Sequence, residues 1–173
     1  MEAFPMFGIV RNFLKYRGTR VLTCPDNHAH VAVRVALFAG GPQPRLKTCT
    51  RWPEKAGCDQ ACVGELEAEP RRTLVQAIAS DWYTGKSCVF CLQPIGEIVW
   101  HERPPALRTP QGTTREWKDV APQELPDVLG SNEPVCWRCH VTESFRREHD
   151  GWVIERPHQV EQEKTLEATT SIY

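Results

Sequence analysis

Two short cysteine pairs carry the clearest chemistry in the sequence. Cys88 and Cys91 form one C-x-x-C pair, and Cys136 and Cys139 form another further along the chain. At this spacing two thiolates from one tight turn can bind a single tetrahedral ion, and two such turns supply the four ligands of a closed structural zinc site. We therefore predict that these four cysteines share one zinc ion.

The remaining four cysteines follow a weaker pattern. They are Cys24, Cys49, Cys58 and Cys62. The first two end predicted strands, and the last two would present both sulfurs on one face if a helix began near Asp59. We predict a second metal site from this set, with zinc as the first choice. An iron–sulfur cluster, which also takes four thiolates, and buried thiols without metal remain the alternatives.

A haem attachment pattern overlaps the second pair. Cys136, Cys139 and His140 match C-x-x-C-H, in which two thioethers fix the porphyrin of haem c and the histidine ligates its iron. Such attachment normally requires an exported chain. Met1–Tyr16 does not resemble a signal peptide, because proline, glycine and charged residues interrupt its apolar positions. Haem c is therefore an alternative that we rank below zinc.

The bulk composition excludes several classes of protein. The chain has 173 residues, 40% of them hydrophobic and 25% charged, which is typical of globular domains. A net charge of −1 gives no overall field that would attract nucleic acid or an anionic membrane. No apolar run reaches the roughly 20 residues that span a bilayer. Without an export signal, eight cysteines indicate metal ligands in a reducing cytoplasm rather than disulfides.

Periodicity predicts a first lobe of strands followed by helices. Residues 1–20 have a basic, amphipathic helical pattern, which suits packing on the domain or docking to a partner or an anionic membrane surface. Apolar residues alternate over 30–38, as in a half-buried strand. Further elements are expected as strands at 20–23 and 45–48, and as helices from near Asp59 and from Pro70 to Gly85.

The second lobe is predicted to contain a hairpin between the two C-x-x-C pairs. Its expected elements are strands at 95–101 and 113–118 and helices at 122–129 and 141–149. The fold class is then α+β, with two small cysteine-rich lobes that are each stabilised by metal. The expected divisions are an N-terminal helix at 1–20, a first lobe at 21–85, a second lobe at 86–156 and a flexible tail at 157–173.

The order of the second lobe resembles that of a known zinc-binding family. A cysteine pair, a hairpin and a helix that opens on the second pair resemble the treble-clef or zinc-ribbon type of zinc finger, over residues 86–150. The resemblance implies a treble-clef-like lobe. A more distant resemblance to HNH nucleases implies His101 as a base and His140 as a metal ligand, with Asn132 between them. Trp100 departs from that pattern, because Asp or His usually precedes the catalytic histidine.

These observations favour a protein that is not an enzyme. We expect a zinc-binding adaptor or accessory subunit that binds another protein, through residues 1–20 or the helix after Cys139. Electron transfer through an iron–sulfur cluster or haem c is the main alternative, and an HNH-like nuclease is the second. The sequence contains no glycine-rich phosphate loop and no nucleophile elbow.

Overall fold

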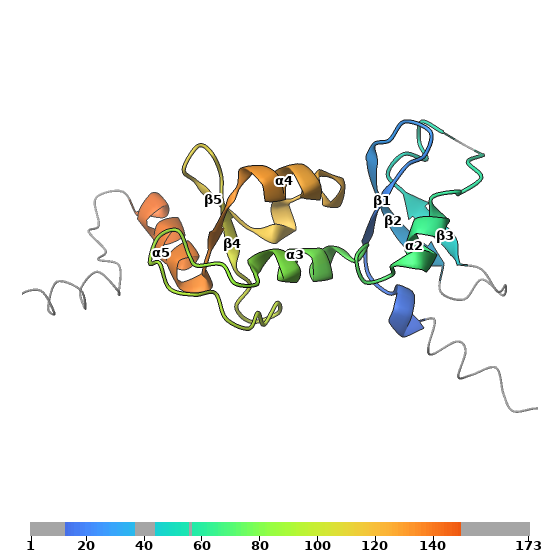
Figure 1. The fold of residues 1–173 in the computed structure, drawn as a ribbon. Coiled ribbons are helices and arrows are strands. Elements are labelled where there is room, and N and C mark those ends of the chain that lie inside the picture. Colours follow the sequence, from blue (N-terminus) through green and yellow to red (C-terminus); the bar gives the residue numbers. More distant parts are fainter. Residues whose placement is uncertain (1–12, 37–43, 56, 150–173) are drawn as a thin grey trace, which may run out of the picture. The chain divides into compact units, whose positions relative to one another are not determined.

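The computed structural model describes residues 13–36, 44–55 and 57–149. Its described elements are mixed helices and two small antiparallel sheets, which confirms the α+β class (Figure 1). The chain divides into two compact units, and the segment 121–127 belongs to the first. Unit 1 comprises Met1–Asp81 and Ala121–Asp127, and unit 2 comprises Trp82–Val120 and Val128–Tyr173.

Unit 1 is built on a three-stranded antiparallel sheet in the order β1-β2-β3. Its strands are β1 (Arg20–Thr23), β2 (His30–Ala36) and β3 (Arg45–Cys49). In β2, Val31, Val33 and Val35 are buried while Arg34 is exposed, as the alternating pattern predicts. The register pairs Leu22 with Val31 and Val33 with Cys49. The apolar face of the sheet therefore forms one wall of a core.

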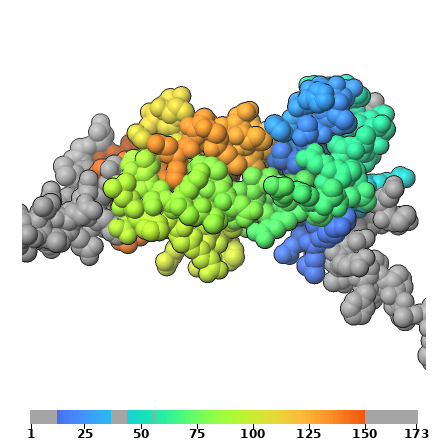
Figure 2. All heavy atoms as spheres, in the orientation of Figure 1, coloured from blue at the N-terminus to red at the C-terminus, as the bar shows by residue number. Residues whose placement is uncertain are grey.

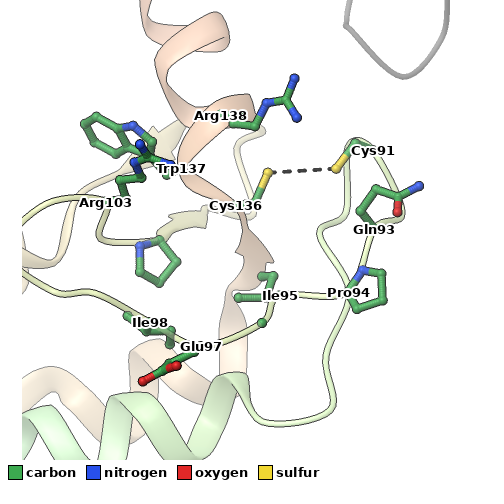
Figure 3. Close-up of a pocket in the computed structure, with 12 residues that line it drawn as sticks. Cys91, Gln93, Pro94, Ile95, Glu97, Ile98, Arg103, Cys136, Trp137 and Arg138 are labelled. Carbon is green, nitrogen blue, oxygen red and sulfur yellow. Dashed lines mark hydrogen bonds between the residues drawn. The ribbon is translucent and has the colours of Figure 1, made fainter. Parts of the chain in front are cut away.

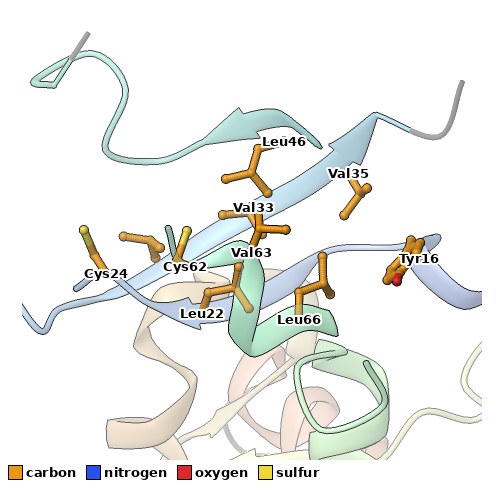
Figure 4. Packing of buried hydrophobic residues seen from close by; sticks show 10 residues of the cluster. Tyr16, Leu22, Cys24, Val33, Val35, Leu46, Cys62, Val63 and Leu66 are labelled. Carbon is orange, nitrogen blue, oxygen red and sulfur yellow. The ribbon is translucent and has the colours of Figure 1, made fainter. Parts of the chain in front are cut away.

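The opposite wall of that core is helix α2 (Val63–Ala68). Val63 and Leu66 pack with Leu22, Val33 and Tyr16 in one buried cluster (Figure 4). Leu22 and Leu66 are completely buried, and each such side chain stabilises the fold by about 1.5–3 kcal/mol. The cluster joins the sheet and α2 in one core.

Only the end of the predicted N-terminal helix falls in the described part of the chain. Residues 13–16 are helical, whereas 1–12 lie outside the described residues. The buried Arg20 guanidinium donates to the carbonyl oxygens of Lys15, at 2.6 Å, and Arg17, at 3.2 Å. These carbonyls close a helix end, where no backbone donor is available to them. Burial lowers the pKa of Arg20.

Two helix starts in unit 1 were predicted too early. Helix α2 begins at Val63 rather than near Asp59, because Asp59 Oδ1 accepts the Ala61 N–H at 3.2 Å and Gln60 has a φ of 61°. Helix α3 (Val75–Tyr83) begins after a turn, not at Pro70. Consequently Cys58 lies in a loop and does not share a helix face with Cys62.

The sheet of unit 2 has the order β5-β4-β6. Its strands are β4 (Ala106–Arg108), β5 (Thr114–Arg115) and β6 (Glu133–Val135). Helices η1 (Trp117–Asp119) and α5 (Trp137–Glu148) also belong to unit 2. Helix η2 (Pro122–Glu124) belongs to unit 1, and α4 (Leu125–Ser131) crosses the boundary between the units after Asp127. Helices near 122–129 and 141–149 were predicted, but strand β6 was not.

The hairpin of unit 2 lies elsewhere than predicted. Residues 95–101 form turns and bends rather than a strand, and β4 is the strand that pairs with β5. The Thr109 N–H donates to the Thr113 carbonyl at 2.8 Å, which closes the predicted turn at 109–112. Ile95 and Ile98 instead pack on buried clusters from an irregular segment. Figure 2 shows this segment, in yellow-green, at the molecular surface.

An aromatic cluster forms the main core of unit 2. Tyr83 and Leu107 are buried at its centre, and Trp82, Trp100 and Trp117 pack around them. The Tyr83 hydroxyl donates to the Ala106 carbonyl at 2.6 Å and accepts from Trp117 Nε1 at 3.1 Å. Burial raises the pKa of Tyr83, which keeps the hydroxyl neutral. The cluster thereby fixes β4 against the end of α3.

Candidate metal centre

The first cysteine pair is held in a tight turn formed by residues 88–93, which we call the knuckle turn. The Cys88 N–H donates to the Gln93 carbonyl at 2.9 Å, and the Leu92 N–H donates to the Cys88 carbonyl at 2.8 Å. Leu92 adopts the left-handed conformation, with a φ of 60°, and the chain reverses direction within this turn. Because the backbone bonds close the turn, the Cys88 and Cys91 side chains leave it from fixed positions.

The second cysteine pair is held by the junction of β6 and α5. Cys136 is the N-cap of α5, with an extended φ of −72° and ψ of 156°, and Cys139 lies in its first turn. Val135, the last residue of β6, is completely buried and anchors this junction. The Val89 N–H donates to the Pro134 carbonyl at 2.9 Å. Strand β6 therefore holds the knuckle turn beside the start of α5.

Together these elements gather four sulfurs, which we call the thiol cluster. The sulfurs of Cys88, Cys91, Cys136 and Cys139 all lie within 4.8 Å of one another. Cys91 Sγ lies 3.8 Å from Cys136 Sγ (Figure 3). Sulfurs bound tetrahedrally at about 2.3 Å from zinc would be separated by about 3.8 Å. The spacing of this pair therefore fits two ligands of one tetrahedral ion.

The proton affinities of the thiol cluster show why it suits a cation. Hydrogen bonds from Cys136 and Cys139 to the Cys88 thiolate hold the pKa of Cys88 well below its usual range. The same contacts, with burial, raise the pKa of Cys139 far above its usual range. When the Cys88 thiol loses its proton, the neighbouring Cys139 thiol therefore becomes harder to deprotonate. Deprotonating all four together requires a positive charge among them, which a bound metal supplies.

Burial makes the thiol cluster a closed centre. Cys88 is 0% exposed and Cys139 is 4% exposed, and both belong to a core cluster with Ala106 and Val135. If these four sulfurs bound one tetrahedral ion, no coordination position would be left for water or substrate. In the part of the chain that the structure describes, this is the one group of three or more potential ligands that is gathered so closely.

The two histidines singled out in the sequence lie outside the thiol cluster. His140 is buried, and its Nε2 lies 3.4 Å from Glu116 Oε1. His101 is exposed in a turn before β4, and not on the hairpin where the nuclease resemblance would place it. Glu116, which no sequence pattern singled out, is therefore the partner of His140. The arrangement joins the hairpin to α5 rather than presenting two histidines to one ligand.

The four cysteines of unit 1 are placed near one another but less tightly. Cys24 and Cys62 are buried in the core of unit 1, and Cys49 packs against it. The pKa of Cys62 is raised to about 11, first by burial and then by the neighbouring thiols of Cys49, Cys58 and Cys24. Among the described residues, these sulfurs do not form a group within 4.8 Å. A metal site here therefore stays a prediction.

A surface pocket adjoins the thiol cluster, and no sequence pattern predicted it. It has a volume of about 350 Å³ and includes Cys91 and Cys136 in its wall (Figure 3). Its apolar lining includes Ile95, Ile98 and Trp137. Its charged lining residues are Glu97, Arg103 and Arg138. The pocket forms because residues 93–98 follow an irregular path. A regular strand in this segment would not have produced the pocket.

Comparisons with known proteins identify no family for this chain. No protein-family profile matches the chain, and no curated protein or solved structure matches it. Within the described residues, no helix is both long enough and apolar enough to cross a bilayer. The function is therefore inferred from the chemistry of this chain's own residues.

Proposed function

We propose that the protein is a non-enzymatic zinc-binding adaptor, in which a structural zinc ion at the thiol cluster holds a surface that binds another protein. The observation that carries the proposal is the closed set of four sulfurs from Cys88, Cys91, Cys136 and Cys139. Closed tetrathiolate sites stabilise folds, whereas catalytic zinc sites keep one position open for water or substrate.

Zinc is favoured over the other cofactors by the sulfur geometry. The 3.8 Å between the Cys91 and Cys136 sulfurs suits ligands of one ion. An iron–sulfur cluster would distribute its thiolates over several iron atoms. Haem c would use Cys136 and Cys139 as thioethers and His140 as an iron ligand, but His140 faces Glu116. A mononuclear site uses all four cysteines in the positions that they occupy.

A binding role is also favoured over nuclease activity. His101 is exposed, and His140 is buried against Glu116. A metal-dependent nuclease needs histidines that converge on a substrate phosphate and an activated water. No contact joins these two histidines among the described residues, whereas the Glu116–His140 contact has a ready structural purpose in tying the β5 region to α5.

The pocket beside the thiol cluster is the proposed binding surface. Apolar side chains line it, and two exposed cations, Arg103 and Arg138, are set against one anion, Glu97. Leu92, at the tip of the knuckle turn, is 70% exposed and adds apolar surface to the same turn. This chemistry suits a partner segment that carries an apolar anchor next to an acidic side chain.

The experiment reverses the charge of the pocket. Partners of the zinc-loaded chain are captured by crosslinking from its own cells, with Arg103→Glu/Arg138→Glu as the variant and Lys47→Glu as a control. Lys47 is exposed in unit 1. We expect one partner to be captured by the wild-type and Lys47→Glu chains and lost at least tenfold from the double variant, with zinc content unchanged. Equal capture by all three chains would contradict the proposed surface.

A further inference from the structure

Unit 1 contains a turn that repeats the knuckle turn of unit 2. In residues 24–29, the Cys24 N–H donates to the Ala29 carbonyl at 2.9 Å, and the His28 N–H donates to the Cys24 carbonyl at 2.8 Å. His28 has a φ of 56°. The knuckle turn has the same two bonds at the same offsets from Cys88, and a φ of 60° at the same position. Cys24 thus occupies the place of Cys88.

The sheet brings a second cysteine toward the end at which Cys24 emerges. Strand β1 ends at Thr23, which pairs with His30, the first residue of β2. Strand β3 runs antiparallel to β2 and ends at Cys49, which pairs with Val33. The Thr50 N–H extends this pairing by donating to the Ala32 carbonyl at 3.0 Å. Cys49 therefore lies opposite the middle of β2, and the backbone after it continues toward the end of β2 beside which Cys24 emerges.

The last two cysteines lie just before and at the start of α2. Cys62 is the N-cap of α2, as Cys136 is the N-cap of α5. The loop from Cys58 to Cys62 is tied to the sheet because the Leu46 N–H donates to Gln60 Oε1 at 2.9 Å. The Gln60 N–H also donates a hydrogen bond to Cys58 Sγ at 3.4 Å. A knuckle-like turn and a cysteine-capped helix thus recur in both units.

The surroundings of Cys24 suit a metal-bound thiolate. Figure 4 shows the Cys24 and Cys62 sulfurs at the end of the core opposite Tyr16. Arg51 Nη1 donates to Cys24 Sγ at 3.0 Å, while Arg51 Nη2 pairs with Asp26 at 2.7 Å. Donors that fix and partly neutralise a coordinating sulfur are the usual outer partners of a metal ligand.

We propose that Cys24, Cys49, Cys58 and Cys62 bind a second zinc ion, which closes unit 1 as the thiol cluster closes unit 2. The ion draws together four sulfurs that the turn, the strand end, the loop and the helix cap already bring to one end of the sheet. The ion would have a structural purpose in unit 1, because it would join the turn at Cys24, the end of β3 and the start of α2, and metal binding contributes folding free energy. The proposal stands apart from the binding role assigned to unit 2.

The test counts metal in the full chain, purified without chelator and analysed for zinc and iron together with its visible absorption. We expect about two zinc ions per wild-type chain and no visible absorption, as closed tetrathiolate zinc sites require. The Cys24→Ser/Cys62→Ser chain should retain about one zinc ion. The control is Ala61→Ser, which places a hydroxyl on the exposed neighbour of Cys62 and should keep both ions.

A reciprocal variant decides the case if the first variant fails to fold. The Cys88→Ser/Cys136→Ser chain lacks the thiol cluster and should still hold about one zinc ion, in unit 1. A wild-type chain with a single zinc ion, which the reciprocal variant loses, would overturn the second site while leaving the thiol cluster intact. Iron with visible absorption that disappears with Cys24→Ser/Cys62→Ser would also overturn it, in favour of an iron–sulfur cluster.

Discussion

Cys88 combines complete burial with a strongly polar environment. Its sulfur is 0% exposed and accepts hydrogen bonds from neighbouring thiols, which lowers the pKa of Cys88. A buried anion without a counter-charge would be costly, because burial removes the solvation of the charge. A bound cation would resolve this conflict, and Cys88 would then be a determinant of the fold of unit 2.

Replacing Cys88 by serine should therefore unfold unit 2. Zinc contributes apparent binding of roughly 10–16 kcal/mol in zinc-finger peptides, which is comparable to the whole folding stability of a typical protein, about 5–15 kcal/mol. Zinc analysis and near-ultraviolet circular dichroism of the tryptophans should show one zinc ion lost and tertiary structure lost with it. Gln93→Ser, an exposed change in the same turn, should alter neither. A Cys88→Ser chain with unchanged zinc would contradict the assignment.

Tyr83 tests a contribution that does not depend on metal. Tyr83→Phe keeps the ring but leaves the Ala106 carbonyl and Trp117 Nε1 without the hydroxyl, at 2.6 and 3.1 Å. Unsatisfied buried groups cost about 1–3 kcal/mol, so urea denaturation should show a loss of that size. Zinc content should remain that of the wild type. Unchanged stability would mean that these two bonds contribute nothing net to the fold.

At the scale of elements, strand β6 connects the two halves of the metal centre. Its central residue, Pro134, accepts the Val89 N–H at 2.9 Å and pairs with Leu107 of β4. Its last residue, Val135, leads directly into Cys136. A chain of three residues thereby sets the distance between the knuckle turn and α5.

Removing the metal should loosen these elements first. In a Cys136→Ser chain, amide hydrogen exchange at Cys88, Val89 and Leu92 should accelerate at least tenfold, because their donors close the knuckle turn and join it to β6. Amides of Val31 and Val33 in β2 should keep their wild-type protection. Equal acceleration in β2 would contradict a metal centre that acts on unit 2 alone.

The elements that could be predicted from sequence are those set by local chemistry. The alternation at Val31, Val33 and Val35 identified β2, and the two C-x-x-C spacings identified the four residues that form the thiol cluster. Strand β6 is three residues long and contains Pro134, so no periodic signal marks it. The apolar run 95–101 looked like a strand, but its side chains pack from an irregular path. The pocket depends on that path, and the Glu116–His140 contact joins two elements that no local pattern relates.

At the scale of the whole molecule, each of the two units has its own core and contains four of the eight cysteines. Unit 1 joins a three-stranded sheet to α2, and unit 2 joins a three-stranded sheet to α5 and an aromatic cluster. A membrane contact was expected of residues 1–20, most of which lie outside the described residues. The predicted tail at 157–173 lies wholly outside them.

Acid should release the metal from both units. Zinc binds thiolates, whose ordinary pKa is about 8.5, so protons compete with it increasingly as pH falls. The apparent affinity should fall about tenfold per pH unit for each thiol that must lose a proton. A zinc-responsive dye should report release on acidification, and re-uptake on return to neutral pH. Release that follows salt concentration at constant pH would instead indicate ions held at the surface.

The most direct test of the thiol cluster is X-ray absorption at the zinc edge of the Cys24→Ser/Cys62→Ser chain, which leaves only the site in unit 2. We expect about one zinc ion per chain, surrounded by four sulfur atoms at about 2.3 Å. A shell that contains nitrogen or oxygen ligands, or a chain that holds iron in place of zinc, would contradict a closed zinc site formed by Cys88, Cys91, Cys136 and Cys139.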